Sequence, residues 1–171
     1  MNFSIQTTIR DLVAPNRHIS FSAKLWFRGL EELKRRSGGF RESGAFLLGK
    51  CVNGVRHIQH FVYYDDLDPH CLDKGIIIFD GTYYRDLWKI CRDYNMDVLA
   101  DVHTHPGHPI QSFLDQSYPM ISKKGHIAII VPHFAKKPVK CRHLGVYEYQ
   151  GNQQWHSIVG RKAAKYLYIG I

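Results

Sequence analysis

The chain has 171 residues, of which 44% are hydrophobic and 22% charged, an ordinary balance for one globular domain with a continuous core. No segment approaches the roughly 18 uninterrupted apolar residues of a membrane-spanning helix, and the first residues lack the cationic start and apolar core of a secretory leader. The formal net charge of +8 allows nucleic-acid binding as an alternative, but no recognisable nucleic-acid module accompanies the scattered basic clusters.

The first third of the chain predicts a strand followed by an amphipathic helix. We expect residues 3–13 to form the strand. Ser20 or Ser22 can accept hydrogen bonds from the first free N–H groups of the helix, and Ser37-Gly38-Gly39 can end it. One apolar stripe at helical spacing then faces the core, made of Phe21, Leu25, Trp26, Leu30 and Leu33.

A β-hairpin is expected next. Apolar runs over residues 43–51 and 55–64 predict two strands. Asn53-Gly54 between them is the dipeptide most typical of a two-residue hairpin turn. The acidic stretch 65–69 that follows is expected to be a turn.

Helices and strands alternate in the second half. A strand is expected over residues 97–103, a helix over 112–122 and a buried central strand over 126–131. Before them, residues 81–94 predict a helix whose core contacts are Tyr84, Leu87, Trp88 and Cys91.

The chain closes with a predicted hairpin of segments 143–150 and 154–159 across Gly151-Asn152. Two or three helices around a mixed sheet correspond to an α+β fold, and we expect residues 1–171 to form a single domain. The cysteines form no C-x-x-C pair, and we expect them to be reduced thiols of a cytoplasmic protein: Cys51, Cys71, Cys91 and Cys141.

The run His103-Thr104-His105-Pro106, at the end of the strand predicted over 97–103, indicates a metal site. Residues i and i+2 of a strand point to the same face, so the two imidazoles can converge on one point. Asp115, ten residues beyond the second histidine, can return across a Gly/Pro loop as a third ligand. Three protein ligands with one open position are typical of catalytic zinc.

Simpler interpretations stay open for the same residues. With 11 histidines in the chain, the pair can be fortuitous, with one ring packed in the core. Ser112 and Asp115 have the spacing of a capping box, a common start of a helix. His108, in the loop between them and the histidine pair, can be an exposed side chain, a further ligand or a substrate contact.

A general base can be assigned upstream. Glu42 immediately precedes the apolar run 43–51. A carboxylate at the mouth of a buried strand can take a proton from water beside a metal. By spacing alone, a solvated glutamate at a strand end is the simpler interpretation.

Together these residues resemble the motif of the JAMM (MPN+, JAB-domain) zinc metalloproteases, in which a distant Glu is followed by His-Ser/Thr-His-Pro and then Ser-x-x-Asp. The resemblance implies that His103, His105 and Asp115 bind Zn2+. It further implies that Glu42 is the general base and acid and that Ser112 stabilises the tetrahedral intermediate. The implied fold is a curved mixed sheet flanked by helices, akin to the cytidine deaminases.

The resemblance covers about residues 40–135 and departs from the family pattern at one point. Only six residues separate His105 from Ser112, one fewer than in the family. The missing residue falls in a loop, where a deletion can be absorbed without moving the flanking elements. It affects Ser112 more than Asp115, because the Ser-x-x-Asp spacing is kept.

By this resemblance, the expected function is zinc-dependent cleavage of an amide bond, as an isopeptidase or peptidase that releases a ubiquitin-like modifier from its conjugate or precursor. The expected partners are the modifier and E1- or E2-like proteins, acting with a stand-alone, prokaryotic-type JAB protein. Two alternatives are kept: a JAB-fold scaffold without catalysis, and a basic nucleic-acid-binding protein, which the sequence favours less.

Overall fold

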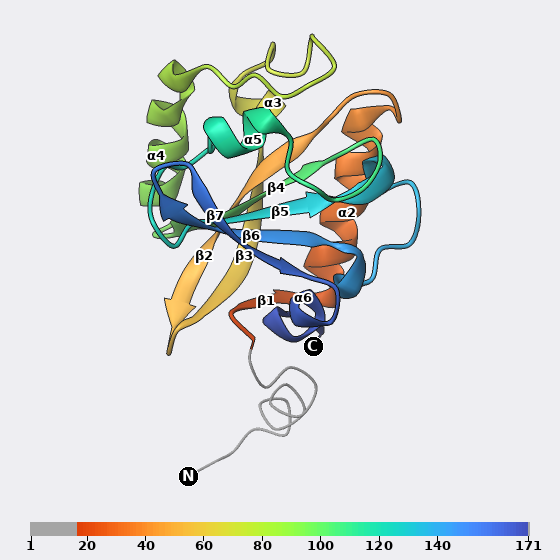
Figure 1. The fold of residues 1–171 in the computed structure, drawn as a ribbon. Helices are drawn as coiled ribbons and strands as arrows, with labels where there is room; N and C mark the ends of the chain where they lie inside the picture. Colours follow the sequence, from red (N-terminus) through yellow and green to blue (C-terminus); the bar gives the residue numbers. More distant parts are fainter. Residues whose placement is uncertain (1–16, 171) are drawn as a thin grey trace.

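The computed structural model describes residues 17–170. They form an eight-stranded mixed sheet in the order β7-β6-β5-β4-β2-β3-β1-β8, with helices on both faces (Figure 1). The pairs β1–β3, β1–β8 and β4–β5 are parallel, and the remaining neighbours are antiparallel. The mixed sheet and the α+β class are therefore as predicted, whereas the strand expected over residues 3–13 lies outside the described residues.

The strands are β1 (Ile19–Ser22), β2 (Gly44–Val52), β3 (Val55–Tyr63), β4 (Asp97–Thr104), β5 (Ile127–Val131), β6 (Gly145–Gly151), β7 (Gln154–Val159) and β8 (Leu167–Gly170). The α-helices within residues 17–170 are α2 (Ala23–Ser37), α3 (Tyr64–Leu67), α4 (Tyr84–Asp93), α5 (Phe113–Ser117) and α6 (Arg161–Tyr166). Two or three helices were expected, and only α2 and α4, with 15 and 10 residues, are longer than two turns.

Helix α2 begins and ends at the predicted signals. The Ser22 hydroxyl accepts a hydrogen bond from the Leu25 N–H at 3.2 Å, and Gly38 closes the helix in the left-handed conformation, with φ 56°. Ser22 rather than Ser20 is thus the cap, and Phe21 belongs to β1. The buried stripe that packs on the sheet comprises Trp26, Leu30 and Leu33.

Strand β2 is buried on both faces, which explains its uninterrupted apolar run. Ala45 and Leu47 join the core cluster that includes α2. Phe46 and Leu48 point to the other face and join the cluster that includes Leu87 of α4. Figure 1 shows the sheet between α2 and α4, with the β2–β3 hairpin extending below.

Three local predictions are wrong. The acidic stretch after β3 is the helical turn α3 rather than a plain turn, and its Asp65 binds Arg36 of α2 at 2.6 Å. The helix expected over 112–122 ends at Ser117, since Pro119 disfavours a helical conformation at the residue before it. Trp88 is 41% exposed, at the edge of the buried stripe of α4.

Two further features concern the cysteines and the helices of the described residues. All four cysteines are free thiols, from the exposed Cys51 to the buried Cys71. Among the helices found over residues 17–170, none has the length and apolar character needed to cross a membrane.

Candidate metal centre

Strand β4 carries the two histidines to one edge of the sheet. Thr104 pairs with Val131 of the parallel strand β5, so both strands end at this edge. His105 follows directly, and its N–H donates to the Val131 carbonyl oxygen at 2.9 Å. The imidazoles of His103 and His105 are buried, and their Nε2 atoms lie 3.0 Å apart. The two rings therefore converge as the i, i+2 spacing predicted.

Asp115 reaches the same point from α5. Its Oδ1 lies 3.4 Å from Nε2 of His103, and its Oδ2 lies 3.2 Å from Nε2 of His105. Oδ2 also accepts a hydrogen bond from the Ser112 N–H at 2.6 Å, while the Ser112 hydroxyl accepts from the Asp115 N–H at 3.2 Å. The capping box is thus present, and it turns the carboxylate toward the histidines.

The loop 106–111 is long enough for this approach despite its missing residue. Its Pro109 carbonyl oxygen accepts a hydrogen bond from the Tyr147 hydroxyl at 2.8 Å. Gly145 of β6 lies so close that a side chain there would overlap the same carbonyl oxygen. The loop is therefore fixed against β6, in a position from which α5 places Asp115 beside the two rings.

Donor atoms, one each from His103, His105 and Asp115, lie close enough together to hold a metal ion. Zn–N and Zn–O bonds of about 2.0–2.1 Å place neighbouring donors about 3.3 Å apart in a tetrahedron. The two imidazole nitrogens lie 3.0 Å apart, with Asp115 Oδ1 at 3.4 Å from His103 and Asp115 Oδ2 at 3.2 Å from His105. Two imidazoles and one carboxylate leave a fourth position for water or substrate. Over residues 17–170, no other group of His, Cys, Asp and Glu converges in this way.

The charges of the cluster favour a cation. Burial opposes the charged form of His103, but Asp101 and Asp115 outweigh it and raise the pKa of this ring to about 10. Burial likewise opposes the ionised form of Asp115, yet the hydrogen bonds with His103 and His105 hold its pKa well below the usual range. The negative charges of Asp101 and Asp115, which favour a proton on His103, would likewise attract a divalent ion in place of that proton.

A second buried carboxylate lies behind the cluster. Asp101 is two residues before His103 on the same face of β4, with Oδ2 3.8 Å from Nδ1 of that ring. Its Oδ1 lies 2.7 Å from Nε2 of His126, and Oδ2 accepts from the Tyr64 hydroxyl at 3.3 Å. Burial opposes ionisation of Asp101, but His103 and His126 lower its pKa, so the carboxylate stays charged.

A carboxylate behind a metal-binding imidazole, as Asp101 is behind His103, orients the ring and increases its basicity. Sequence reasoning missed both Asp101 and His126. The signal for Asp101 was available, because the two-residue alternation that links His103 to His105 applies equally to the residue two places earlier. His126 carries no such local signal, since only the pairing of β4 with β5 brings it near.

Glu42 lies at the rim of the cluster. Gly44 of β2 pairs with His103 of β4, and the same antiparallel register continued by two residues places Glu42 opposite His105. Its Oε1 is 3.7 Å from Nε2 of His105, and its Oε2 accepts a hydrogen bond from the Ile77 N–H at 3.3 Å. One carboxylate oxygen is therefore fixed, while the other faces the candidate metal position.

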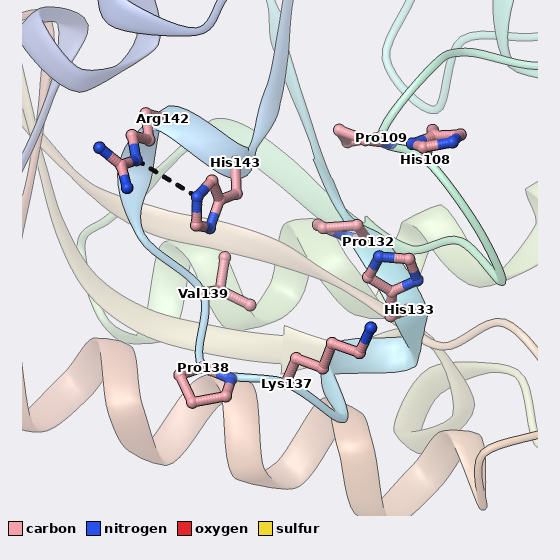
Figure 2. Close-up of a pocket in the computed structure, with 9 residues that line it drawn as sticks. All are labelled: His108, Pro109, Pro132, His133, Lys137, Pro138, Val139, Arg142 and His143. Carbon is pink, nitrogen blue, oxygen red and sulfur yellow. Dashed lines mark hydrogen bonds between the residues drawn. The ribbon is translucent and has the colours of Figure 1, made fainter.

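Ser112 and His108 lie farther out. Ser112 is exposed, and its hydroxyl oxygen accepts the Asp115 N–H, which leaves the hydroxyl proton able to donate. His108 is not part of the converging group and instead lines a neighbouring pocket (Figure 2). The structure thus gathers His103, His105, Asp115 and Glu42.

Comparison with known proteins gives a distant relative and a similar fold. No protein-family model matches the chain. Over 114 residues it is 26% identical to a protein named Probable metalloprotease y4jG, from Sinorhizobium fredii (strain NBRC 101917 / NGR234), covering 61% of this chain and 68% of that protein. The fold is similar to the solution structure of protein DSY2949 from Desulfitobacterium hafniense, with a TM-score of 0.62 and 17% identity, covering 88% of this chain and 92% of that one. The first likeness points to a metalloprotease, and the second concerns the fold alone.

Proposed function

We propose that this protein is a zinc-dependent peptidase of the JAMM type. The observation that carries the proposal is the convergence of His103, His105 and Asp115 at separations of 3.0 to 3.4 Å, with Glu42 beside them. The relative named a probable metalloprotease supports the hydrolytic class. The motif resemblance supports the type.

Each side chain has a part in the proposed reaction. Zinc in such a site would supply Lewis acidity, which acidifies water and polarises the scissile carbonyl. Glu42, whose free oxygen is 3.7 Å from Nε2 of His105, takes the proton from that water and passes it to the departing amine. Ser112 donates its hydroxyl proton to the developing oxyanion. Ile77 holds the second oxygen of Glu42 and so keeps the base in place.

The surroundings support a polypeptide substrate. Large apolar side chains next to the site are exposed, including Phe40 at 76%, Ile110 at 66% and Phe113 at 80%. Ile76 and Ile78, on either side of the residue that holds Glu42, are exposed as well. Exposed apolar side chains on the segments around a site are typical of surfaces that contact a partner. We propose an amide or isopeptide bond to a ubiquitin-like modifier as the substrate, with E1- or E2-like proteins as partners.

Activity and zinc content of matched variants test the proposal. The zinc-loaded protein should cleave fluorogenic modifier fusions, and a chelator should stop it. In Glu42→Gln, kcat should fall about 100- to 10,000-fold while zinc stays bound. In His103→Ala, zinc should be lost. Glu31→Gln, which alters an exposed carboxylate on α2, serves as the control and should change neither kcat nor the zinc content.

The outcomes separate the alternatives. Full activity in Glu42→Gln would remove this residue from the mechanism. A wild-type protein that binds zinc without cleaving any fusion would support the scaffold alternative. Salt-dependent binding to DNA or RNA that survives chelation would support the nucleic-acid alternative.

A further inference from the structure

A pocket lies beside loop 106–111, which follows the two histidines of the candidate metal centre (Figure 2). Its volume is about 460 Å³, comparable to sites that hold small ligands. Loop 106–111 contributes one wall, the turn after β5 a second, and the segment leading to β6 the rest. The residues that line it are His108, Pro109, Pro132, His133, Lys137, Pro138, Val139, Arg142 and His143.

The lining carries positive charge and no carboxylate. Lys137 and Arg142 are cations, and three further lining residues are histidines. Among residues 17–170, neither cation forms a salt bridge, in contrast to Arg36, which is bound by Glu32 and Asp65. A concave surface lined by one sign of charge concentrates its field on a ligand of the opposite sign.

Hydrogen-bond donors also face the hollow. The Arg142 Nε–H donates to Nε2 of His143 at 3.3 Å, which leaves the proton of a neutral His143 ring on Nδ1 as a free donor. Figure 2 shows Lys137 extending toward His133, while His143 faces the pocket from the opposite side. Charged and neutral donors on facing walls suit an oxyanion with more than one oxygen.

The wall at His133 has an unusual backbone. His133, Phe134 and Ala135 are consecutive non-glycine residues with φ of 56°, 51° and 56°. This left-handed conformation is unfavourable for L-residues, and such strain concentrates at functional sites. The turn is fixed to the metal-binding segment, because the Phe134 N–H donates to the His105 carbonyl oxygen at 2.9 Å. A ligand in the pocket is thereby positioned relative to His105.

We propose that this pocket binds a carboxylate of the polypeptide substrate close to the bond that is cleaved. Assignment of the carboxylate to a substrate rests on the proposed peptidase function, whereas the binding itself does not. The carboxylate belongs either to an acidic side chain or to a chain terminus. Both sources offer the same two-oxygen anion to Lys137 and the histidines, and Arg142 adds to the positive charge of the lining.

Calorimetric titration of the zinc-loaded, full-length protein with three short peptides tests the pocket. The probes are acetyl-Gly-Gly-Asp-Gly-amide, its Asn counterpart, and an acetylated tetraglycine with a free carboxyl terminus. We expect one carboxylate peptide to bind at least fivefold more tightly than the Asn amide. Preference for the Asp peptide identifies a side chain as the source, and preference for tetraglycine identifies a terminus.

Variants then locate the binding. Lys137→Gln and Arg142→Gln should each lower the affinity for the preferred peptide about fivefold or more. Lys140→Gln removes the same charge from an exposed position in the same segment, outside the pocket lining, and should stay within twofold. Because zinc is present throughout, a carboxylate that bound the metal alone would give equal affinities in all three variants and overturn the proposal.

Hydrolysis separates this inference from the proposed function. The protein could cleave peptide fusions but show no preference for a carboxylate in binding or in kcat/KM. That result would overturn the proposal for the pocket and leave the proposed peptidase function unaffected. A carboxylate preference that depends on Lys137, in a protein that cleaves nothing, would support the pocket and overturn the peptidase.

Discussion

Behind His103, the pair formed by Asp101 and His126 is buried and joined at 2.7 Å. We expect Asp101→Asn to lower zinc affinity about 10- to 100-fold, because the ring of His103 would lose the charge that orients it and increases its basicity. Competition with a chromophoric chelator measures the affinity. Asp97→Asn, on the exposed start of the same strand, is the matched control.

His126→Gln is a second variant on the same pair and should have a smaller effect in the same direction, since the Asp101 charge remains. Thermal melts of the chelated proteins show whether either variant loses stability as well. Unchanged zinc affinity in a folded Asp101→Asn protein would assign the pair to packing alone.

Residue-level prediction succeeded where a short-range rule applied. The strand alternation was enough to bring His103 and His105 together, and the S-x-x-D spacing was enough to expect a capping box. Glu42 was a candidate base from its place before the apolar run, but only the motif resemblance favoured it over a solvated glutamate, because its closeness to His105 depends on the register between β2 and β4. The roles of these residues in binding and catalysis stay predictions.

At the scale of elements, the contact between β6 and loop 106–111 decides where α5 lies. A Cβ at Gly145 would overlap the Pro109 carbonyl oxygen, and backbone cannot yield as a flexible side chain can. Gly145→Ala should destabilise the protein by about 1–3 kcal/mol and weaken zinc binding by displacing Asp115.

Gly107→Ala is the matched comparison, since it adds the same methyl group to loop 106–111 itself, at a position with open space around it. Chemical denaturation and zinc competition on both variants check the prediction. Equal effects of the two substitutions would show that loop 106–111 tolerates movement without consequence for the metal centre.

Helices α2 and α3 are joined by an ion network in which Arg36 binds Glu32 of α2 and Asp65 of α3. The hydrogen bond from Arg35 lowers the pKa of Glu32 to about 2, with a further contribution from Arg36. Arg36 also binds Asp65 of α3 at 2.6 Å. A carboxyl whose pKa is lower in the folded state stabilises the fold above its unfolded pKa and loses this contribution as the pH falls.

We therefore expect Glu32→Gln to cost about 1 kcal/mol at pH 7, an amount typical of partly exposed ion pairs. The difference from wild type should shrink between about pH 5 and pH 2, where Glu32 becomes protonated in the unfolded and then in the folded chain. Urea denaturation at several pH values measures it. Glu31→Gln, whose carboxylate is 77% exposed, should show no such pH-dependent difference.

Elements defined by local signals were predicted and those defined by distant pairing were not. The cap at Ser22, the C-terminal Gly38 and the Asn53-Gly54 turn place α2 and the β2–β3 hairpin correctly. By contrast, β1 and β8 are four-residue strands that pair in parallel with each other, and nothing in either segment alone indicates the partner. The six-residue helix α6 was missed as well, because it begins after Gly160 without a side-chain cap.

For the molecule as a whole, zinc should act as a stabilising ligand. At 100 times its Kd, a ligand that binds only the folded state adds about 2.7 kcal/mol. For a protein of this size, that corresponds to a rise in Tm of about 5–10 °C. Melting curves with zinc and with chelator measure the shift.

His103→Ala should abolish this response, whereas His156→Ala, an exposed histidine of β7, should keep it. A zinc response of the same size in both variants would mean that the ion binds elsewhere.

The α+β class was predicted from the number and kind of elements, but the strand order was not, because it depends on crossovers that no local pattern encodes.

The carboxylate of Asp115 faces two neighbours at once, the histidine pair and the first turn of α5. Metal occupancy and the winding of that turn are consequently reciprocal: an ion that holds Asp115 rigid also limits fraying around Phe113 and Leu114. Loss of the metal would then alter the exposed apolar surface formed by Phe113 and Leu114 together with the metal centre itself.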